Sequence, residues 1–441
     1  MSVAEVLLLR EGTSDVIETR RHEILGLNGT LWRLAIVAGV AQLSVSIWTW
    51  QFAIFLDGFL SPWDVGLTFT VGALAALVGF PISGAFADYF GRKKTMSFAF
   101  LPLCIGLFLL YSMPTWPFVA GSYGLTQFGW SFIIIISRAM PADEIANKQL
   151  DDPTKKFTMV LMPAFLMDGL SPIVAVFLLE ANIRFKYLLL MGAVAGIVAL
   201  GLTAAFVRET LHRETIIKAK RETKIPIRKL GPKFWFFTGG MVGYYIAWGL
   251  AIPYIGPLCV TAWGMDVTVF GFTWSVFSLT TVAIMYGLSS LADAGRKRAL
   301  IGSLFLNAIV MILFGIGSGV VMMFALNIVW AAPIVVWIGV ERTMAIDGVA
   351  EQFKGRALGT YQLIMSATAL IATPAGALIW EITSSLRTLW IFSGLLALLS
   401  VTFVYWGIYR KPRRSIASKG PFSGGSVDQS TERSCFTENS V

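Results

Sequence analysis

The stretch GAFADYFGRKK, residues 84–94, is a short charged link between two long apolar runs. Its charged residues are Asp88, Arg92, Lys93 and Lys94, and all of them fall within seven residues. A charged side chain is costly inside a lipid bilayer, so charges gathered between apolar runs are typical of a link at a membrane surface. Whether this chain crosses a membrane depends on the rest of the sequence.

The composition is that of a membrane protein. Of the 441 residues, 56% are hydrophobic and only 14% are charged, and the mean hydropathy is +0.71. A soluble domain of this length needs far more polar surface to cover its core. The sequence therefore predicts that the chain lies in a lipid bilayer.

Charged residues divide the chain into intervals that fit membrane-spanning helices, each of which needs about 20 apolar residues. Asp64 to Asp88 and Lys186 to Arg208, for example, enclose 23 and 21 residues. Two double-length stretches, residues 95–137 and 299–340, are split by the turn-forming sequences SMPTWP and GIGSG. Between Lys233 and Asp266 we expect one helix followed by the loop IGPLCVTAWG. The predicted fold class is all-α, a polytopic membrane protein with twelve transmembrane helices.

Lysine and arginine predict how the chain is oriented, because translocated loops avoid them. An even number of spans places both termini on one side, and a cytoplasmic N-terminus puts all but three of the 35 basic residues on the cytoplasmic side. The three exceptions are Arg184, Lys186 and Arg387. We therefore expect both termini in the cytoplasm and the protein in the cell membrane. The net charge of +9 follows from this orientation and needs no nucleic-acid partner.

Few residues are available for metal or thiol chemistry. The three cysteines, Cys104, Cys259 and Cys435, have no ligand-like spacing, and the only histidines are His22 and His212. The N-terminal thirty residues contain one short apolar run and several acids, unlike a signal peptide. We expect no metal, no cofactor and no enzyme activity.

Two motifs recur along the chain at an offset of about 205 residues. ADYFGRKK at residues 87–94 corresponds to ADAGRKR at 292–298, and SRAMPADEIA at 137–146 corresponds to ERTMAIDGVA at 341–350. In the second pair Arg, Met and Asp stand at identical spacing. The pattern predicts two parallel repeats of six helices, an organisation known from secondary transporters. The expected segments are a cytoplasmic N-terminal segment 1–30, an N-terminal half 31–207, a cytoplasmic linker 208–233, a C-terminal half 234–409 and a disordered cytoplasmic tail 410–441.

The quoted stretch fits the pattern Gly-x3-Asp-x2-Gly-Arg-Lys, which resembles the signature of the major facilitator superfamily of transporters. It falls between the second and third predicted spans, as in that family. The second copy, Ser289 to Arg298, lacks the leading glycine and is one residue shorter. GRALGTYQ at 355–362 is similar to the start of the family's span eleven. Spans, repeat and signature together cover residues 31–410, and the resemblance implies two halves that rock about a central cavity.

The resemblance also implies a cytoplasmic latch between the halves. Gly84 is expected to admit a neighbouring helix, and Gly91 to permit the tight turn of the link. The alternative for the charged residues is that they only orient the chain and end the helices. The gate candidates are Gly84, Asp88, Gly91, Arg92, Arg138, Asp143, Glu144, Asp293, Arg296 and Arg342.

By this reading, a single charged residue lies inside the predicted spans. Asp168 falls near the middle of span five, where a carboxylate costs about 2.5–3.5 kcal/mol on insertion scales. Such a group can gain and lose a proton as its surroundings alternate between wet and dry, so Asp168 is the proton-coupling candidate. The alternative is a structural role, bonding backbone carbonyls loosened by Pro163 or Pro172.

No lysine, arginine or histidine falls within the predicted spans, which disfavours a carrier of strong anions. Neutral and aromatic side chains near the middle of spans one, four, seven and ten suit sugars, polyols or uncharged drug-like solutes, and Asp168 also suits a cationic one. The alternative for each aromatic residue is core packing. The cavity candidates are Gln42, Ser46, Tyr123, Gln127, Tyr245, Trp248, Asn327 and Trp330.

The sequence thus predicts a secondary active transporter, a symporter or antiporter working as a monomer. It would move a small organic solute by alternating access, coupled to H⁺ through Asp168. The alternatives are a drug or metabolite efflux antiporter, and a non-transporting membrane sensor on the same scaffold.

Overall fold

The computed structural model describes residues 27–112, 115–148, 153–210, 230–345, 347, 349 and 354–409. The residues up to Tyr409 form one compact unit. The predicted disordered tail and most of the predicted N-terminal segment and linker lie outside the described residues.

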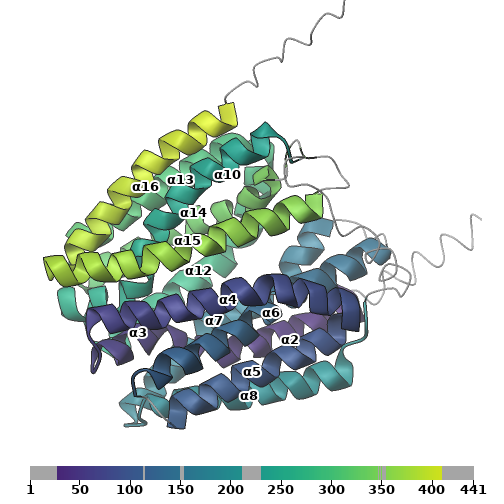
Figure 1. The fold of residues 1–441 in the computed structure, drawn as a ribbon, viewed down its shortest axis with the longest axis horizontal. Helices are drawn as coiled ribbons and strands as arrows, with labels where there is room; N and C mark the ends of the chain where they lie inside the picture. Colours follow the sequence, from purple (N-terminus) through teal and green to yellow (C-terminus); the bar gives the residue numbers. More distant parts are fainter. Residues whose placement is uncertain are drawn as a thin grey trace, which may run out of the picture. The chain divides into compact units, whose positions relative to one another are not determined.

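Helices account for almost all of the described chain (Figure 1). They are α2 (Gly29–Ser46), α3 (Thr49–Asp57), α4 (Pro62–Phe90), α5 (Arg92–Ser112), α6 (Phe118–Asn147), α7 (Pro153–Glu180), α8 (Lys186–Phe206), α10 (Pro232–Ala251), η2 (Ile252–Tyr254), α11 (Ile255–Pro257), η3 (Leu258–Ala262), α12 (Val267–Ala294), α13 (Arg296–Ile316), α14 (Val320–Ala345), α15 (Lys354–Thr383) and α16 (Leu386–Tyr409).

Twelve helical stretches in the described ranges are long and apolar enough to cross a membrane, as predicted. The two expected turns are also confirmed: α5 ends at Ser112 before α6 begins at Phe118, and α13 ends at Ile316 before α14 begins at Val320. In a membrane the backbone must satisfy its own hydrogen bonds, which is why spans of this composition form helices. The start of α4 shows the usual signals, since Ser61 caps it and Pro62 opens it.

The helices pack as two groups, α2–α8 and α10–α16, which we call the N-half and the C-half. Within each half, long helices lie against one another, such as α4 and α5 on α6, and α10 and α13 on α16. Glycines permit the closest approaches: a Cβ at Gly376 of α15 would lie 2.1 Å from the Leu250 carbonyl oxygen. The two halves meet along α4 and α15, and along α7 and α12.

Spans one and seven, which correspond in the repeat, are both interrupted. Span one breaks at Ile47 and Trp48 between α2 and α3. Span seven leaves α-helical geometry at Ile252 and continues as the short turns η2, α11 and η3. The prediction that IGPLCVTAWG forms a loop is therefore wrong for most of the stretch. Pro253 and Pro257 lack backbone N–H groups, so the chain stays wound but loses regular α-helical bonding there.

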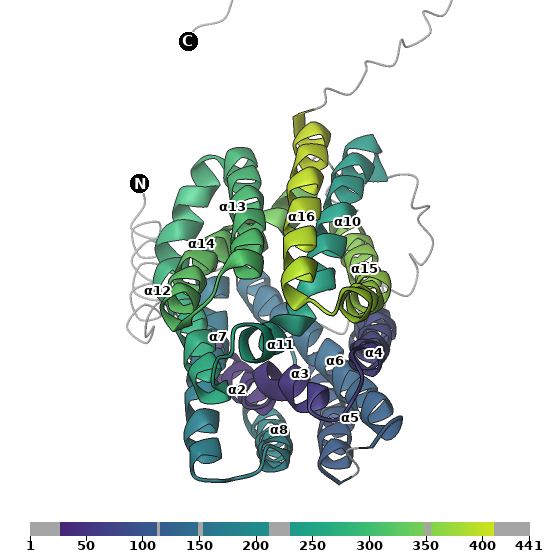
Figure 2. The ribbon, with the colours of Figure 1, turned by 90° about the vertical axis from the view of Figure 1, so that its left-hand side faces the viewer.

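The contacts between the halves gather toward the end of the molecule where α3 meets α4, which we call the α3–α4 end. There α11 lies beside α3 (Figure 2), and a Cβ at Gly256 would lie 2.8 Å from a side-chain carbon of Ile54. A Cβ at Gly66 of α4 would lie 2.3 Å from that of Ala377 of α15. Close packing at this end therefore holds the halves together in this structure.

Two glycines lie beside open space at the opposite end, where α4 meets α5 and which we call the α4–α5 end. Gly84 of α4 and Gly287 of α12 have no atom within 4 Å of a Cβ built on them. The close helix approach expected at Gly84 is thus not made in this structure. The positive-inside pattern predicts that this end faces the cytoplasm.

Candidate functional site

Asp168 lies on α7 within a network of neutral hydrogen-bond donors. Its Oδ1 accepts from the Ser46 hydroxyl at 2.5 Å and from Gln42 Nε2 at 3.3 Å. Gln42 Nε2 also donates to Ser46 Oγ at 2.8 Å. The Oδ2 accepts from the Ser278 hydroxyl at 2.8 Å. Three residues that the sequence singled out separately are therefore in contact, and Ser278 joins them.

The network connects the two halves near the middle of the spans. Asp168, Gln42 and Ser46 belong to the N-half, whereas Ser278 lies on α12 in the C-half. Next to it, a Cβ at Gly169 would lie 2.9 Å from side-chain carbons of Leu279, so α7 and α12 pack closely at this level. The Asp168–Ser278 bond is a polar contact across this packed interface.

The chemistry of the network is compatible with both protonation states of Asp168. A carboxylate accepts from all three donors, while a carboxylic acid can donate to a hydroxyl oxygen or to the Gln42 carbonyl after these groups rotate. No ion pair with Asp168 is recorded for the described residues.

Another carboxylate within a membrane-spanning helix, Glu341 on α14, was not predicted. Its side chain is only 4% exposed. Glu341 accepts from the Tyr245 hydroxyl at 2.8 Å and from the Tyr361 hydroxyl at 2.5 Å. Both tyrosines belong to the C-half, on α10 and α15. This cluster is internal to one half, unlike the Asp168 network.

Glu341 was missed because the predicted span ten ended before its first charge, at residue 340, whereas α14 continues to Ala345. A comparison of the two repeats could have singled out Glu341. The position that corresponds to Glu341 in the N-half is Ser137, so the acid has no counterpart there. The expectation that Asp168 is the only charge inside the spans is therefore wrong.

Two arginines also lie within membrane-spanning helices. The span Phe118–Ile145 contains Arg138, and the span Val320–Arg342 ends with Arg342. Arg138 interacts electrostatically with Arg342 and with Tyr245, which both belong to the C-half. The prediction that the spans contain no basic residue is therefore wrong. The argument against anionic solutes depended on that prediction and no longer holds.

The remaining N-half cavity candidates are packed in different ways. Tyr123 is 4% exposed, stacks on Phe52 with ring centroids 4.9 Å apart, and fills the space left by Gly72. Gln127 is half-buried and donates from Nε2 to the Tyr123 hydroxyl at 2.8 Å. Tyr123 is thus a core residue in this structure, and Gln127 lies at its border.

The C-half cavity candidates also include both buried core residues and residues that keep exposed surface. Asn327 is fully buried and donates to the Met323 carbonyl of its own helix at 2.9 Å. Trp330 is 2% exposed and donates from Nε1 to Asn307 Oδ1 at 2.6 Å. Trp248 is half-buried, with its ring 5.6 Å from that of Trp330. Only Tyr245 and Trp248 keep exposed surface among the four predicted residues of spans seven and ten.

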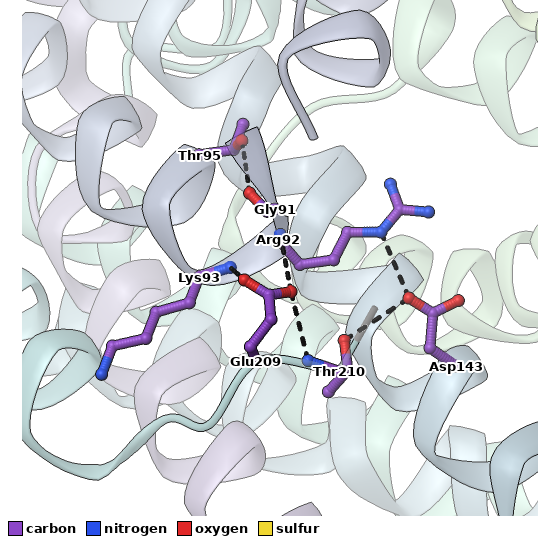
Figure 3. Close-up of polar contacts among 7 residues, drawn as sticks. All are labelled: Gly91, Arg92, Lys93, Thr95, Asp143, Glu209 and Thr210. Carbon is purple, nitrogen blue, oxygen red and sulfur yellow. Dashed lines mark hydrogen bonds and ion pairs between the residues drawn. The ribbon is translucent and has the colours of Figure 1, made fainter. Parts of the chain in front are cut away.

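Two gate candidates of the link, Gly91 and Arg92, form a cluster with Asp143 and Glu209 inside the N-half (Figure 3). Arg92 Nε pairs with Asp143 Oδ2 at 3.2 Å. Gly91 has a φ of +96°, as expected for a tight turn, and a Cβ there would lie 2.4 Å from Glu209 Oε2. Glu209 accepts from the backbone N–H groups of Arg92 at 2.8 Å and Lys93 at 3.1 Å, so it caps α5.

Glu209 was predicted only as part of the linker 208–233, so the first residues of that segment belong to the N-half. The other gate candidates are less informative. Glu144 pairs with Lys148 at 2.6 Å on its own helix, and Arg296 is exposed at the start of α13. The side chains of Asp88 and Asp293 lie outside the described part of the structure.

Comparisons with known proteins agree with this architecture. A family model described as Major Facilitator Superfamily matches residues 34–244. A search of curated protein sequences found no match. Among solved structures, a mutant of the nucleoside transporter NupG superposes with a TM-score of 0.71 at 11% identity, covering 87% of this chain and all of that one.

Two further structures share the fold. A D-xylose–proton symporter has a TM-score of 0.67 at 13% identity, covering 86% of this chain and 98% of that one. The human organic anion transporter MFSD10 has a TM-score of 0.63 at 13% identity, covering 86% of this chain and all of the other. At these identities the likeness shows the fold alone. The chain thus has the twelve-helix fold of these transporters, and over its N-half its sequence matches the model of the Major Facilitator Superfamily.

Proposed function

We propose that the protein moves a small organic solute across the membrane by alternating access and couples this movement to protons through Asp168. The family model over the N-half and the fold support a secondary transporter. The coupling ion and the solute are the parts proposed. The observation that carries the proposal is the hydrogen-bond network that joins Asp168 to both halves.

Alternating access requires the halves to rock against each other, so contacts between them change during the cycle. Asp168 keeps its Gln42 and Ser46 donors, which belong to its own half, while its bond to Ser278 depends on the position of the C-half. A carboxylate and a carboxylic acid use these partners differently, because the acid must donate its own proton to one of them. We infer that movement of the halves, which makes or breaks the Ser278 bond, is thereby linked to whether Asp168 carries a proton.

The state of the structure fits such a cycle. The halves are packed together at the α3–α4 end, and Gly84 and Gly287 at the α4–α5 end have open space beside them. With the predicted orientation, this arrangement is open toward the cytoplasm. The half-buried side chains Gln42, Gln127, Tyr245 and Trp248 are then the candidate contacts for a solute, because they retain exposed surface.

Thermal stabilisation of the purified protein tests the proposal. The panel comprises D-xylose, mannitol, uridine, succinate and tetraphenylphosphonium, each at pH 6 and pH 8. A ligand at 100 times its Kd adds about 2.7 kcal/mol to the free energy of unfolding. We expect one class to stabilise wild type to a degree that depends on pH, and to stabilise Asp168→Asn equally at both pH values.

Glu180→Gln is the matched control, because it converts a carboxylate to an amide on the same helix at an exposed position. This variant should keep the pH dependence of wild type. If a ligand stabilises wild type and Asp168→Asn alike at both pH values, Asp168 is structural and the proton coupling proposed here is wrong.

A further inference from the structure

Four aromatic rings of the C-half follow one another beside the Asp168 network, and we call them the aromatic row. Trp274 and Phe277 of α12 have ring centroids 5.7 Å apart. Phe277 lies 5.0 Å from Trp330 of α14, which in turn lies 5.6 Å from Trp248 of α10. Trp330 is 2% exposed, whereas the other three rings are half-buried. Three helices of one half thus contribute to a continuous row of rings that keeps exposed surface.

The row lies next to the Asp168 carboxylate because Ser278 belongs to the surroundings of both. Ser278 donates to Asp168 Oδ2 at 2.8 Å and directly follows Phe277 in the chain. Trp274 precedes Ser278 by four residues, so both lie on the same face of α12, with Cβ atoms about 5–6 Å apart. A carboxylate from the N-half and rings from the C-half therefore meet where the halves adjoin.

The Asp168 carboxylate has no basic partner. The structure describes every side chain of α2, of α7 from Met159 to Glu180, and of α12 from Val267 to Met285. Within these ranges its recorded partners are the three neutral groups already described, and no ion pair is recorded there. An unpaired carboxylate is costly at this depth of a membrane, so a cation that binds beside Asp168 stabilises its ionised form.

The other charged residues on α7, and on the helices α2, α6 and α12 packed against it, fall in the first five or the last ten residues of their helices. They are Arg33 on α2, Arg138, Asp143 and Glu144 on α6, Lys155, Lys156 and Glu180 on α7, and Asp293 on α12. Lys156 and Glu180 are each twelve residues from Asp168, a rise of about 18 Å. Arg342 follows Trp330 on α14 by the same number, so the row is likewise separated from that guanidinium group.

We propose that the transported solute is an organic cation with an aromatic body, whose charge pairs with Asp168 while its ring packs on the aromatic row. The inference rests on the proposed transport function and names the solute class for it. Aromatic faces attract cations and stack with other rings. A neutral solute uses the rings alone, and a bare metal ion uses the carboxylate alone. The combination therefore selects a cation that carries a ring.

The proton and such a solute compete for one group. Protonation of Asp168 removes the negative charge that the cation needs, so the apparent affinity for the cation falls as the pH is lowered. Because the carboxyl group holds either the proton or the cation, transport of this solute is an exchange for H⁺.

The experiment is thermal stabilisation of the full chain, purified in an uncharged detergent, at pH 6 and pH 8. The probes are phenethylammonium, which has a ring and a charge, 2-phenylethanol, which has the ring alone, and ethylammonium, which has the charge alone. We expect phenethylammonium to stabilise wild type, more strongly at pH 8, and the two reference compounds not to do so at equal concentration. Asp168→Asn should weaken the apparent affinity for phenethylammonium at least tenfold and remove its pH dependence.

Substitutions in the aromatic row test the contact with the ring. Trp248→Leu and Phe277→Leu should each weaken the apparent affinity for phenethylammonium at least threefold, while Phe277→Tyr, which keeps a ring, should retain most of it. Trp235→Leu is the matched control, because Trp235 lies on the same helix as Trp248 but is 39% exposed. It should leave the affinity unchanged. A circular dichroism melt of each variant checks folding.

Three results would overturn the inference. The first is that phenethylammonium does not stabilise wild type. The second is that 2-phenylethanol stabilises it equally, so that the charge has no effect. The third is that phenethylammonium binds Asp168→Asn, or both leucine variants of the row, as tightly as wild type. If D-xylose, mannitol or uridine instead stabilises wild type in a pH-dependent way and Asp168→Asn equally at both pH values, the proton coupling stands and only the assignment of the solute class fails.

Discussion

Asp168 and Glu341 are both carboxyl groups inside membrane-spanning helices, and both are held by hydroxyl groups. They differ in the origin of those hydroxyls. Asp168 is bound by Ser46 from its own half and by Ser278 from the other half, whereas both tyrosine partners of Glu341 come from the C-half. When the halves move, the surroundings of Asp168 must change, while the Glu341 cluster can travel as a unit. Asp168 is therefore suited to coupling and Glu341 to holding its half together.

The largest expected effect is on stability at Glu341. In Glu341→Ala two buried tyrosine hydroxyls lose their acceptor, at a cost of about 1–3 kcal/mol each. Glu341→Gln keeps an acceptor oxygen and should cost much less. The apparent melting temperature in detergent measures both. Asp168→Ala should cost less than Glu341→Ala, because Ser46 and Ser278 can bond carbonyls of their own helices instead. A larger loss at Asp168 would contradict the comparison.

A steric change between the halves should come next. Gly66→Val places a side chain against Ala377 at the α3–α4 end, where overpacking costs about 1–3 kcal/mol. The strain is relieved if the halves separate there. We expect faster maleimide labelling of an introduced Ile54→Cys, in a background without Cys104, Cys259 and Cys435. Gly84→Ala, on the same helix but in open space, is the control and should leave the rate unchanged.

Removing single hydroxyl groups tests the comparison between the Asp168 network and the Glu341 cluster directly. Ser278→Ala deletes a bond between the halves, and Tyr361→Phe deletes one within the C-half. A hydrogen bond contributes about 0.5–1.5 kcal/mol, roughly a 2- to 12-fold change in an equilibrium constant. Ser278→Ala should therefore change the labelling rate of Ile54→Cys by up to this factor, and Tyr361→Phe should not. If the two variants change the labelling rate equally, the Ser278 bond holds the halves together no more than the Tyr361 bond does, and the comparison is wrong.

The smallest effect is expected at the link. The Arg92–Asp143 ion pair lies within the N-half, and its side chains are 15% and 25% exposed. Such a pair contributes less than about 1 kcal/mol, so Asp143→Asn should lower the melting temperature only slightly. It should not alter the labelling rate of Ile54→Cys. A clear change in that rate would show that the link also acts between the halves, as the family resemblance implies.

Features that depend on local sequence were predicted well. Apolar length and turn residues gave the twelve spans and their divisions at SMPTWP and GIGSG. The positive φ at Gly91 followed from the need for a tight turn. Asp168, Gln42 and Ser46 were each selected for being polar near mid-span, and the structure places them in contact.

Features that depend on packing were not predicted. Ser278 is an ordinary serine until α7 and α12 come together, and Glu209 lies 117 residues from the Arg92 backbone it caps. Glu341 was missed, and the gate candidates Arg138 and Arg342 were placed outside the spans, because each span was ended at its first charge. Tyrosine hydroxyls from two other helices make the Glu341 position tolerable, and no pattern within a single helix reveals them.

The most direct test of the account is solute accumulation in proteoliposomes under an imposed pH gradient. The solute is the one that stabilises the protein most in the ligand panel. Wild type should accumulate it against its concentration gradient and lose that ability when a protonophore is added. Asp168→Asn should exchange the solute across the membrane without accumulating it. If Asp168→Asn accumulates the solute as wild type does, Asp168 does not carry the proton and the central claim is wrong.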